Sequence, residues 1–259
     1  MISYIKSELY RIFHSKGSYL FIIICSALLI SANVVLAVVG HTEESFPYNN
    51  TSFSLSLFYS YLPIIFLLCV SVASIVFGNE YTNHTMKNST SYGISRGSIY
   101  FGKFITEVLY AVTALVVIAV LYIGSAYLLL ENSHSGDPEL AARAYFVALP
   151  LFLFALATTH CFLFIIESTG GAITAVIGVL IAFPLVSNFL GMKFELFRKL
   201  SEILPWNLIN KMSFNYEKYQ LNLPWEGSTG YLNYWLYGVL WMTLFVLIGF
   251  FVFRKKEIK

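Results

Sequence analysis

Residues 77–103 read FGNEYTNHTMKNSTSYGISRGSIYFGK and lie between two apolar runs of membrane-spanning length. This polar stretch carries Lys87, Arg96 and Lys103, and its only acid is Glu80. Because an excess of Lys and Arg marks the cytoplasmic loops of membrane proteins, we expect the stretch to face the cytoplasm. It is too long for a tight turn, and its Asn, Ser, Thr and Tyr side chains suit a surface on which a soluble protein docks.

The composition of the whole chain is typical of a membrane protein. Of the 259 residues, 58% are hydrophobic and only 12% are charged, whereas a soluble domain carries about 25% charged residues. The apolar runs are long and unbroken, which predicts membrane-spanning helices and not the short alternating strands of a barrel. A net charge of +2 without a basic stripe argues against a nucleic-acid partner.

The hydropathy pattern predicts a single transmembrane domain over residues 1–259, and the fold class is an all-α integral membrane protein with six spans. About 20 residues at a rise of 1.5 Å cross a hydrocarbon core of about 30 Å. The predicted spans are residues 19–39, 57–77, 104–130, 144–166, 172–190 and 231–253.

Two amphipathic segments accompany the spans. In residues 1–18 the apolar side chains recur at helical spacing, which predicts a helix lying in the headgroup region. The alternative is a plain cytoplasmic extension of the first span. Residues 191–230 form a predicted extracellular segment, in which a short amphipathic helix is stopped by Pro205.

The positions of the basic residues predict the orientation. Lys and Arg gather in residues 1–18, 77–103 and 254–259, whereas the first two loops of the opposite side hold only Arg143. By the positive-inside rule, both termini and the loop of residues 78–103 are expected in the cytoplasm.

Motifs for chemistry are absent from the sequence. Gly97, Gly102 and Lys103 fit half of a phosphate-binding loop, but Phe104 stands where Ser or Thr would reach magnesium. No HExxH or GxSxG motif occurs. The three cysteines lie in separate apolar runs, where they are read as apolar side chains. We therefore expect no catalytic residue, no metal site and no cofactor in this chain.

Two ionisable residues fall inside predicted spans, where such groups are functional candidates. Glu107 lies within one helical turn of Lys103, so a paired or snorkelling carboxylate is the favoured interpretation. His160 is expected to form a hydrogen bond with a neighbouring helix, and the alternative is a proton or substrate group.

The polar stretch resembles the loop after the second span in ABC-2 type transporter permeases. The residues that carry this resemblance are Glu80, Thr85-Met86-Lys87, Ser95-Arg96 and Gly102-Lys103, with His84 where those proteins usually have Gly. The amphipathic N-terminus, the six spans, the outer segment before the last span and the basic C-terminus agree with it. The resemblance therefore covers essentially the full length.

The resemblance implies a permease subunit of an ATP-driven ABC transporter in the cell membrane of a bacterium. Such a subunit pairs with an identical or related permease and with two copies of an ATP-binding subunit, which holds the ATP and magnesium. Residues 78–103 would be the loop that couples the two kinds of subunit. The coupling residues that the resemblance implies are Glu80, Thr85, Lys87, Ser95, Arg96 and Lys103.

Short permeases of this type resemble those that export or expel peptides, antibiotics and bacteriocins, including self-immunity systems. The spans lack a ring of acids or bases, so an amphipathic or apolar substrate, lipid-like ones included, fits better than a small charged one. Polarity within the spans suggests a substrate path, and its candidate residues are Asn33, Thr158, Thr159, His160, Ser187 and Asn188.

Two other classes of function stay open at this point. An intramembrane enzyme would need acidic, His or Cys side chains paired at one depth of the membrane. A scaffold or sensor subunit would transport no substrate. ATPase-dependent movement of a substrate distinguishes a transporter from both.

Overall fold

The structure is a computed structural model, and it describes residues 1–43, 45–78, 85–133, 138–215, 220–222 and 230–256. The helices of the first half are α1 (Ile2–Phe13), α2 (Lys16–Thr42), α3 (Thr51–Ser60), α4 (Leu62–Phe77), α5 (Thr85–Ser91) and α6 (Arg96–Leu129). The second half holds α7 (Pro138–Ile165), α8 (Thr169–Ile177), the wider helical turn η1 (Gly178–Ala182), α9 (Phe183–Gly191), α10 (Glu195–Ile203), α11 (Pro205–Asn210) and α12 (Gly230–Lys255).

Several of these helices can cross a membrane. Among the described residues, five helical segments are long and apolar enough, and the bent pair α3–α4 gives a sixth if it counts as one span. The five segments are Lys16–Thr42, Arg96–Leu129, Ala142–Ile165, Thr169–Gly191 and Gly230–Lys255. Within hydrocarbon, helices satisfy their own backbone groups. The protein is an all-α integral membrane protein, as the sequence predicts.

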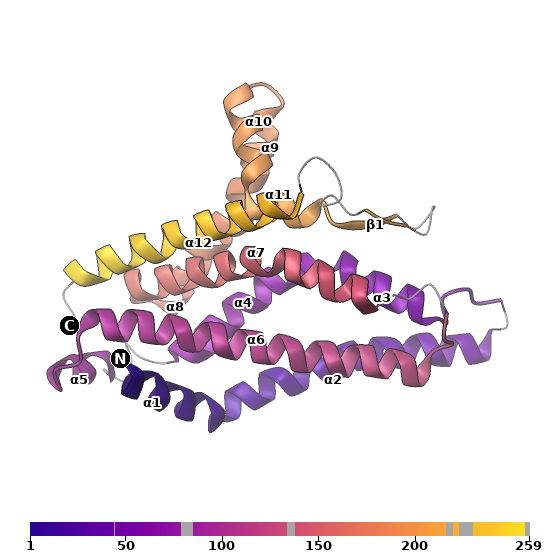
Figure 1. Ribbon diagram of the computed structural model, residues 1–259, viewed down its shortest axis with the longest axis horizontal. Coiled ribbons are helices and arrows are strands. Elements are labelled where there is room, and N and C mark those ends of the chain that lie inside the picture. The colour runs from indigo at the N-terminus through magenta and orange to yellow at the C-terminus, as the bar shows by residue number, and fades with distance from the viewer. Residues whose placement is uncertain (44, 79–84, 134–137, 216–219, 223–229, 257–259) are drawn as a thin grey trace.

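The centre of the bundle is α7. In its membrane-spanning stretch 78% of the residues are buried, whereas in the stretches of the other four long segments 17–28% are buried. Figure 1 shows α12, α7, α6 and α2 side by side along the long axis of the molecule. The helix α4 packs on α7 as well.

Glycines allow the close packing of α12 on α7. A Cβ atom on Gly238 would lie 2.6 Å from Cβ of Pro150, and one on Gly249 would lie 3.0 Å from Cα of Cys161. Small residues at helix interfaces let backbones approach one another within a membrane. These two contacts bring the last span against the central one.

The second span is broken, although the sequence predicts one continuous helix over residues 57–77. The helices α3 and α4 are bent by 55° relative to one another, and the break lies at Tyr61. The cause is Pro63, which has no backbone N–H and occupies the first turn of α4. A proline there begins a new helix more readily than it continues an existing one.

The polar stretch is also more helical than predicted. It contains α5, and α6 begins at Arg96, eight residues before the predicted start of the third span. Figure 1 shows that α5, the start of α6, the end of α12 and α1 lie at the same end of the molecule, which we call the α5 end.

Residues 191–230 contain more structure than the single helix that the sequence predicts. The helix α10 ends before Pro205, as predicted, and α11 follows it. A short antiparallel hairpin, β1 (Ser213–Asn215) with β2 (Gln220–Asn222), was not predicted. In Figure 1, α9 and α10 pack on one another and project from the bundle.

Candidate functional site

At the α5 end, a cation from another part of the chain caps the last helix. The guanidinium of Arg96 donates to the carbonyl oxygens of Phe253 at 3.1 Å, Arg254 at 2.9 Å and Lys256 at 2.5 Å. The last carbonyls of a helix lack partners within it and carry partial negative charge. Arg96 therefore ties the start of α6 to the end of α12.

A second cation caps the central helix in the same way. The ammonium of Lys256 donates to the carbonyl oxygen of Ile165 at 3.0 Å and lies 3.6 Å from the carboxylate of Glu167. Burial lowers the pKa of Lys256, and the nearby Glu167 offsets only part of that effect. The segment after α12 is thus attached to the end of α7.

A third cation, Arg11 of α1, donates to the carbonyl oxygen of Val76 in the last turn of α4 and lies 2.6 Å from the carboxylate of Glu8. Glu8 also lies 2.9 Å from the ammonium of Lys103, whose side chain is fully buried. Burial by itself raises the pKa of Glu8, but Lys103 and Arg11 outweigh it and hold this pKa below its usual value. The helix α1 is therefore bonded to both helices that flank the polar stretch.

These contacts form one unit, which we call the loop base. It consists of Glu8, Arg11, Arg96, Lys103 and Lys256. Close packing adds to the charge contacts, because a Cβ atom on Gly102 would lie 2.7 Å from the Tyr4 ring. The loop base ties the start of α6 to α1 and α12, α1 to the end of α4, and the segment after α12 to the end of α7.

Deeper in the bundle, the structure pairs two buried ionisable residues. The Nδ1 atom of His160 lies 2.9 Å from both carboxylate oxygens of Glu107, and neither side chain is exposed. The rings of Tyr100 and Phe164 lie 4.4 Å and 4.7 Å from the imidazole. Within the described residues, Nε2 of His160 has no hydrogen-bond partner. This pair joins α6 to α7.

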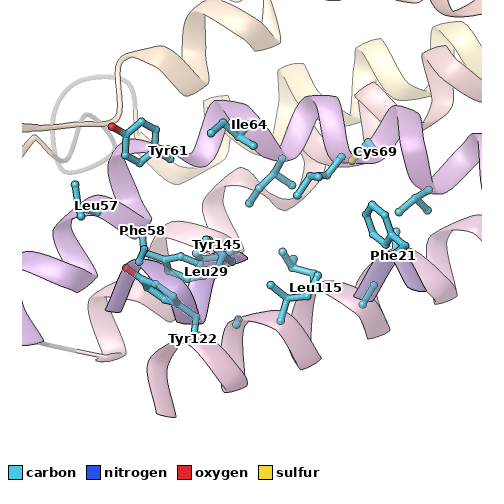
Figure 2. Close-up of a pocket in the computed structure, with 18 residues that line it drawn as sticks. Phe21, Leu29, Leu57, Phe58, Tyr61, Ile64, Cys69, Leu115, Tyr122 and Tyr145 are labelled. Carbon is cyan, nitrogen blue, oxygen red and sulfur yellow. The ribbon is translucent and has the colours of Figure 1, made fainter. Parts of the chain in front are cut away.

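An apolar cavity of about 300 Å³ lies between α2, α4 and α6. Figure 2 shows residues of α4 and α6 on opposite sides of it, with Phe21 near one end and Phe58, Tyr122 and Tyr145 together at the other. Its lining is almost entirely aliphatic or aromatic: Phe21, Leu29, Ala32, Leu57, Phe58, Tyr61, Ile64, Ile65, Leu68, Cys69, Val72, Ala111, Ala114, Leu115, Ile118, Ala119, Tyr122 and Tyr145.

Residues 4–186 match the family model of ABC-2 family transporter proteins. The chain belongs to the ABC-2 family. The matched region contains most of the loop base, the Glu107–His160 pair and the whole lining of the cavity. As an ABC-2 permease it is a transport subunit of an ABC transporter rather than an enzyme, and membrane proteins of this family work with an ATP-binding subunit. A comparison with curated proteins gives no match.

The ABC-2 chain does not present all six predicted coupling residues to a partner. Glu80 lies outside the described residues, and Thr85 is the first residue of α5. Lys87 is exposed on α5. Ser95 is also exposed, and its hydroxyl caps α6 by accepting from the Ser98 backbone N–H at 3.2 Å.

Arg96 and Lys103 differ from their predicted placement. The sequence predicts both as coupling residues of the loop, but Arg96 is directed at the end of α12 and Lys103 is buried against Glu8. The physical reason is that α6 begins at Arg96, so Lys103 lies inside the bundle against a carboxylate and the half-buried Arg96 lies beside the unpaired carbonyls at the end of α12. Both residues anchor the start of α6, Arg96 to α12 and Lys103 to α1.

The six predicted path residues do not gather at one site in this ABC-2 permease. Thr158 and Thr159 donate to the carbonyls one turn earlier in α7, and neither is exposed. Ser187 is buried on α9, whereas the exposed Asn188 exchanges two hydrogen bonds with Asn207 at 2.9 Å and 3.0 Å.

Asn33 has a structural role beside the cavity. Its amide nitrogen donates to the carbonyl of Tyr122 at 3.1 Å and to the hydroxyl of Ser125 at 2.7 Å, and its amide oxygen accepts from Ser54 at 2.6 Å. This network joins α2, α3 and α6. His160 likewise contacts a neighbouring helix, which was the favoured interpretation of that residue.

The cavity itself was missed from the sequence. Its signal was the row of small residues Ala111, Ala114 and Ala119 on one face of α6, opposite the aromatic residues of a broken second span. Within the described residues, no group of three His, Cys, Asp or Glu side chains could hold a metal ion.

Proposed function

We propose that this ABC-2 permease moves an amphipathic or apolar molecule out of the cell or out of its membrane, driven by ATP hydrolysis in a separate subunit. The observation that carries the proposal is the loop base. Five charged side chains link the start of α6 to α1 and α12, α1 to α4, and the segment after α12 to α7, while Lys87 on α5 stays exposed.

This arrangement suits the transmission of force. A partner that grips α5 displaces a segment whose two flanking helices are bonded to α1, and one of them also to α12. Because the links are short charge-assisted hydrogen bonds, they resist stretching more than apolar contacts do. Movement of the ATP-binding subunits would thus reach several spans together.

The α5 end is proposed to face the cytoplasm, with both termini on that side and the permease in a bacterial cell membrane. The cations of the loop base support this orientation, because basic residues stay on the cytoplasmic side during insertion. Two copies of the ATP-binding subunit, carrying ATP and magnesium, would dock there.

A second permease subunit, identical or related, completes the proposed transporter. Supporting this, α9 presents Leu185, Val186 and Phe189, each more than half exposed, on a segment that projects from the bundle. In an isologous dimer the same face of each copy would cover the other.

The class of substrate follows from the interior of the permease. The cavity between α2, α4 and α6 offers aliphatic and aromatic surface. Peptides, antibiotics and lipid-like amphiphiles present matching apolar surface, and resistance or immunity to such compounds would follow from their removal.

Co-purification with the cognate ATP-binding subunit in nanodiscs tests the proposal. The wild-type chain is compared with Glu80→Arg and Lys87→Glu, and with Lys193→Glu, an exposed lysine outside the polar stretch. We expect a stable ATP-hydrolysing complex that the first two changes weaken and the third does not. If no ATP-binding subunit associates with a correctly folded chain, the scaffold or sensor function is favoured instead.

A further inference from the structure

The apolar cavity has the properties of a binding site for a hydrocarbon chain. Its polar groups are few, and two of them are satisfied elsewhere. The hydroxyl of Tyr122 donates to the backbone carbonyl of Ser54 at 2.7 Å, and the thiol of Cys69 lies 3.6 Å from the carbonyl of Phe152. A buried water needs two to four polar partners, and apolar cavities of this kind stay dry or take apolar guests.

The shape of the cavity favours a chain over a ring system. Its lining on α6 runs from Ala111 to Tyr122, which is about 16 Å of helix at a rise of 1.5 Å per residue. A volume of about 300 Å³ spread over that length makes the cavity long and narrow. This is room for one extended hydrocarbon chain and not for two side by side.

The opening of the cavity faces the side of the bundle. Tyr61 at the break before α4 is 57% exposed, Ile64 on α4 is 48% exposed, and Ala32 on α2 is exposed. These residues lie in spans or at the span break, so the surface on which the cavity opens is in contact with lipid. The main packing partner of α2 is α6 and that of α4 is α7, which leaves α2 and α4 separated at the opening.

We infer that the cavity binds the hydrocarbon chain of a single-chain amphiphile that enters from the bilayer between α2 and α4. The inference that this amphiphile is a substrate rests on the proposed transport function. The chain enters beside Phe58, whose ring centroid lies 4.8 Å from those of Tyr122 and Tyr145, and extends along α6 toward Phe21. The polar head stays at the opening, where Tyr61 is exposed. A two-chain lipid fits less well, because its second chain would have to lie across this opening.

The energetic gain is one of packing. Lipid tails are as apolar as the cavity wall, so a chain gains little by leaving them for another apolar surface. An empty cavity, however, forfeits the dispersion contacts of its lining. A chain that fills the space recovers these contacts, and occupancy depends on how well it fits.

Photolabelling of the full chain tests the inference. The purified protein in phosphatidylcholine nanodiscs is irradiated with hexadecanoic acid that carries a mid-chain diazirine, and the adducts are mapped by peptide mass spectrometry. We expect adducts on the lining of α4 and α6, with at least tenfold less labelling in Ala114→Trp, which fills the cavity. The matched control Val116→Trp lies on the same helix, faces outward with 54% exposure and keeps wild-type labelling.

A milder variant, Ala119→Leu, covers the case in which Ala114→Trp does not fold, and several-fold less labelling is expected. Equal labelling of wild type and filled variants would overturn the inference. So would equally strong labelling of the cavity by a phosphatidylcholine that carries the diazirine in one tail. The assay needs neither ATP nor an ATP-binding subunit, so its result is separate from that of the co-purification experiment.

Discussion

Single charged residues hold the α5 end together. Arg11, Lys256 and Arg96 cap the last turns of α4, α7 and α12 in that order. A cation at a helix C-terminus contributes about 0.3–1 kcal/mol at the surface and up to about 2 kcal/mol when partly buried. These residues account physically for part of the basic charge that the sequence places on one side of the membrane.

Replacing Arg96 should therefore loosen the end of α12. We expect Arg96→Gln to lower stability by about 2 kcal/mol, because three carbonyls lose their donor. The measurement is the thermal unfolding temperature in detergent. Arg254→Gln is the control, since that side chain is exposed on the same helix. Equal effects of the two changes would contradict the capping role.

The buried pair of Glu107 and His160 should behave as a structural link. Glu107→Ala leaves the imidazole without its acceptor, and we expect a loss of about 3 kcal/mol. Replacing both residues with apolar ones, Glu107→Leu with His160→Phe, should restore most of the stability. Transport by a stable double variant supports a packing role, whereas a stable variant without transport places the pair in the substrate path.

The contact between Glu8 and Lys103 should make stability depend on pH. Because the pKa of Glu8 is lowered in the folded state, its stabilisation is present above 4.5, the ordinary pKa of the carboxyl group, and is lost as the pH falls through the lowered pKa. At pH 7 we expect Glu8→Gln to be about 2 kcal/mol less stable than wild type. The difference should shrink below pH 4.5. The control is Glu202→Gln, at an exposed site. Its unfolding curves should match those of wild type both at pH 7 and below pH 4.5.

At the scale of the elements, most of the helical content could be predicted from hydropathy. Apolar length alone indicates α2, α6, α7 and α12. The break at Tyr61 could not be predicted from hydropathy, because Pro63 is compatible both with the first turn of one long helix and with the start of a new helix. The hairpin of β1 and β2 falls within a segment of weak pattern, so its pairing could not be derived locally.

The projecting segment formed by α9 and α10 suits a test of subunit pairing. In a background with the three cysteines replaced, we expect Phe189→Cys to form a disulfide between two copies, since its side chain is 71% exposed on α9. Val116→Cys on α6, also exposed to the surroundings of the bundle, serves as the control. The readout is a dimer band on a non-reducing gel from membranes. Equal yields at both positions would indicate random collisions.

At the scale of the whole molecule, the candidate site could be predicted only in part. The polar stretch and its resemblance to ABC-2 permeases led to the family, which the match over residues 4–186 confirms. The contacts of Arg96 join residues 157 to 160 positions apart, and sequence patterns do not report such pairs. The cavity arises only when α2, α4 and α6 come together, so individual polar residues could not reveal it.

Coupling between α5 and an ATP-binding subunit is the central feature of the proposed transporter. The most direct measurement is the rate of ATP hydrolysis by the cognate subunit, reconstituted in nanodiscs with the wild-type chain or with Lys87→Glu. We expect the wild-type chain to stimulate hydrolysis and Lys87→Glu to remove most of the stimulation while the thermal unfolding temperature stays unchanged. A subunit that hydrolyses ATP at the same rate with either chain, or without one, would contradict the proposed coupling.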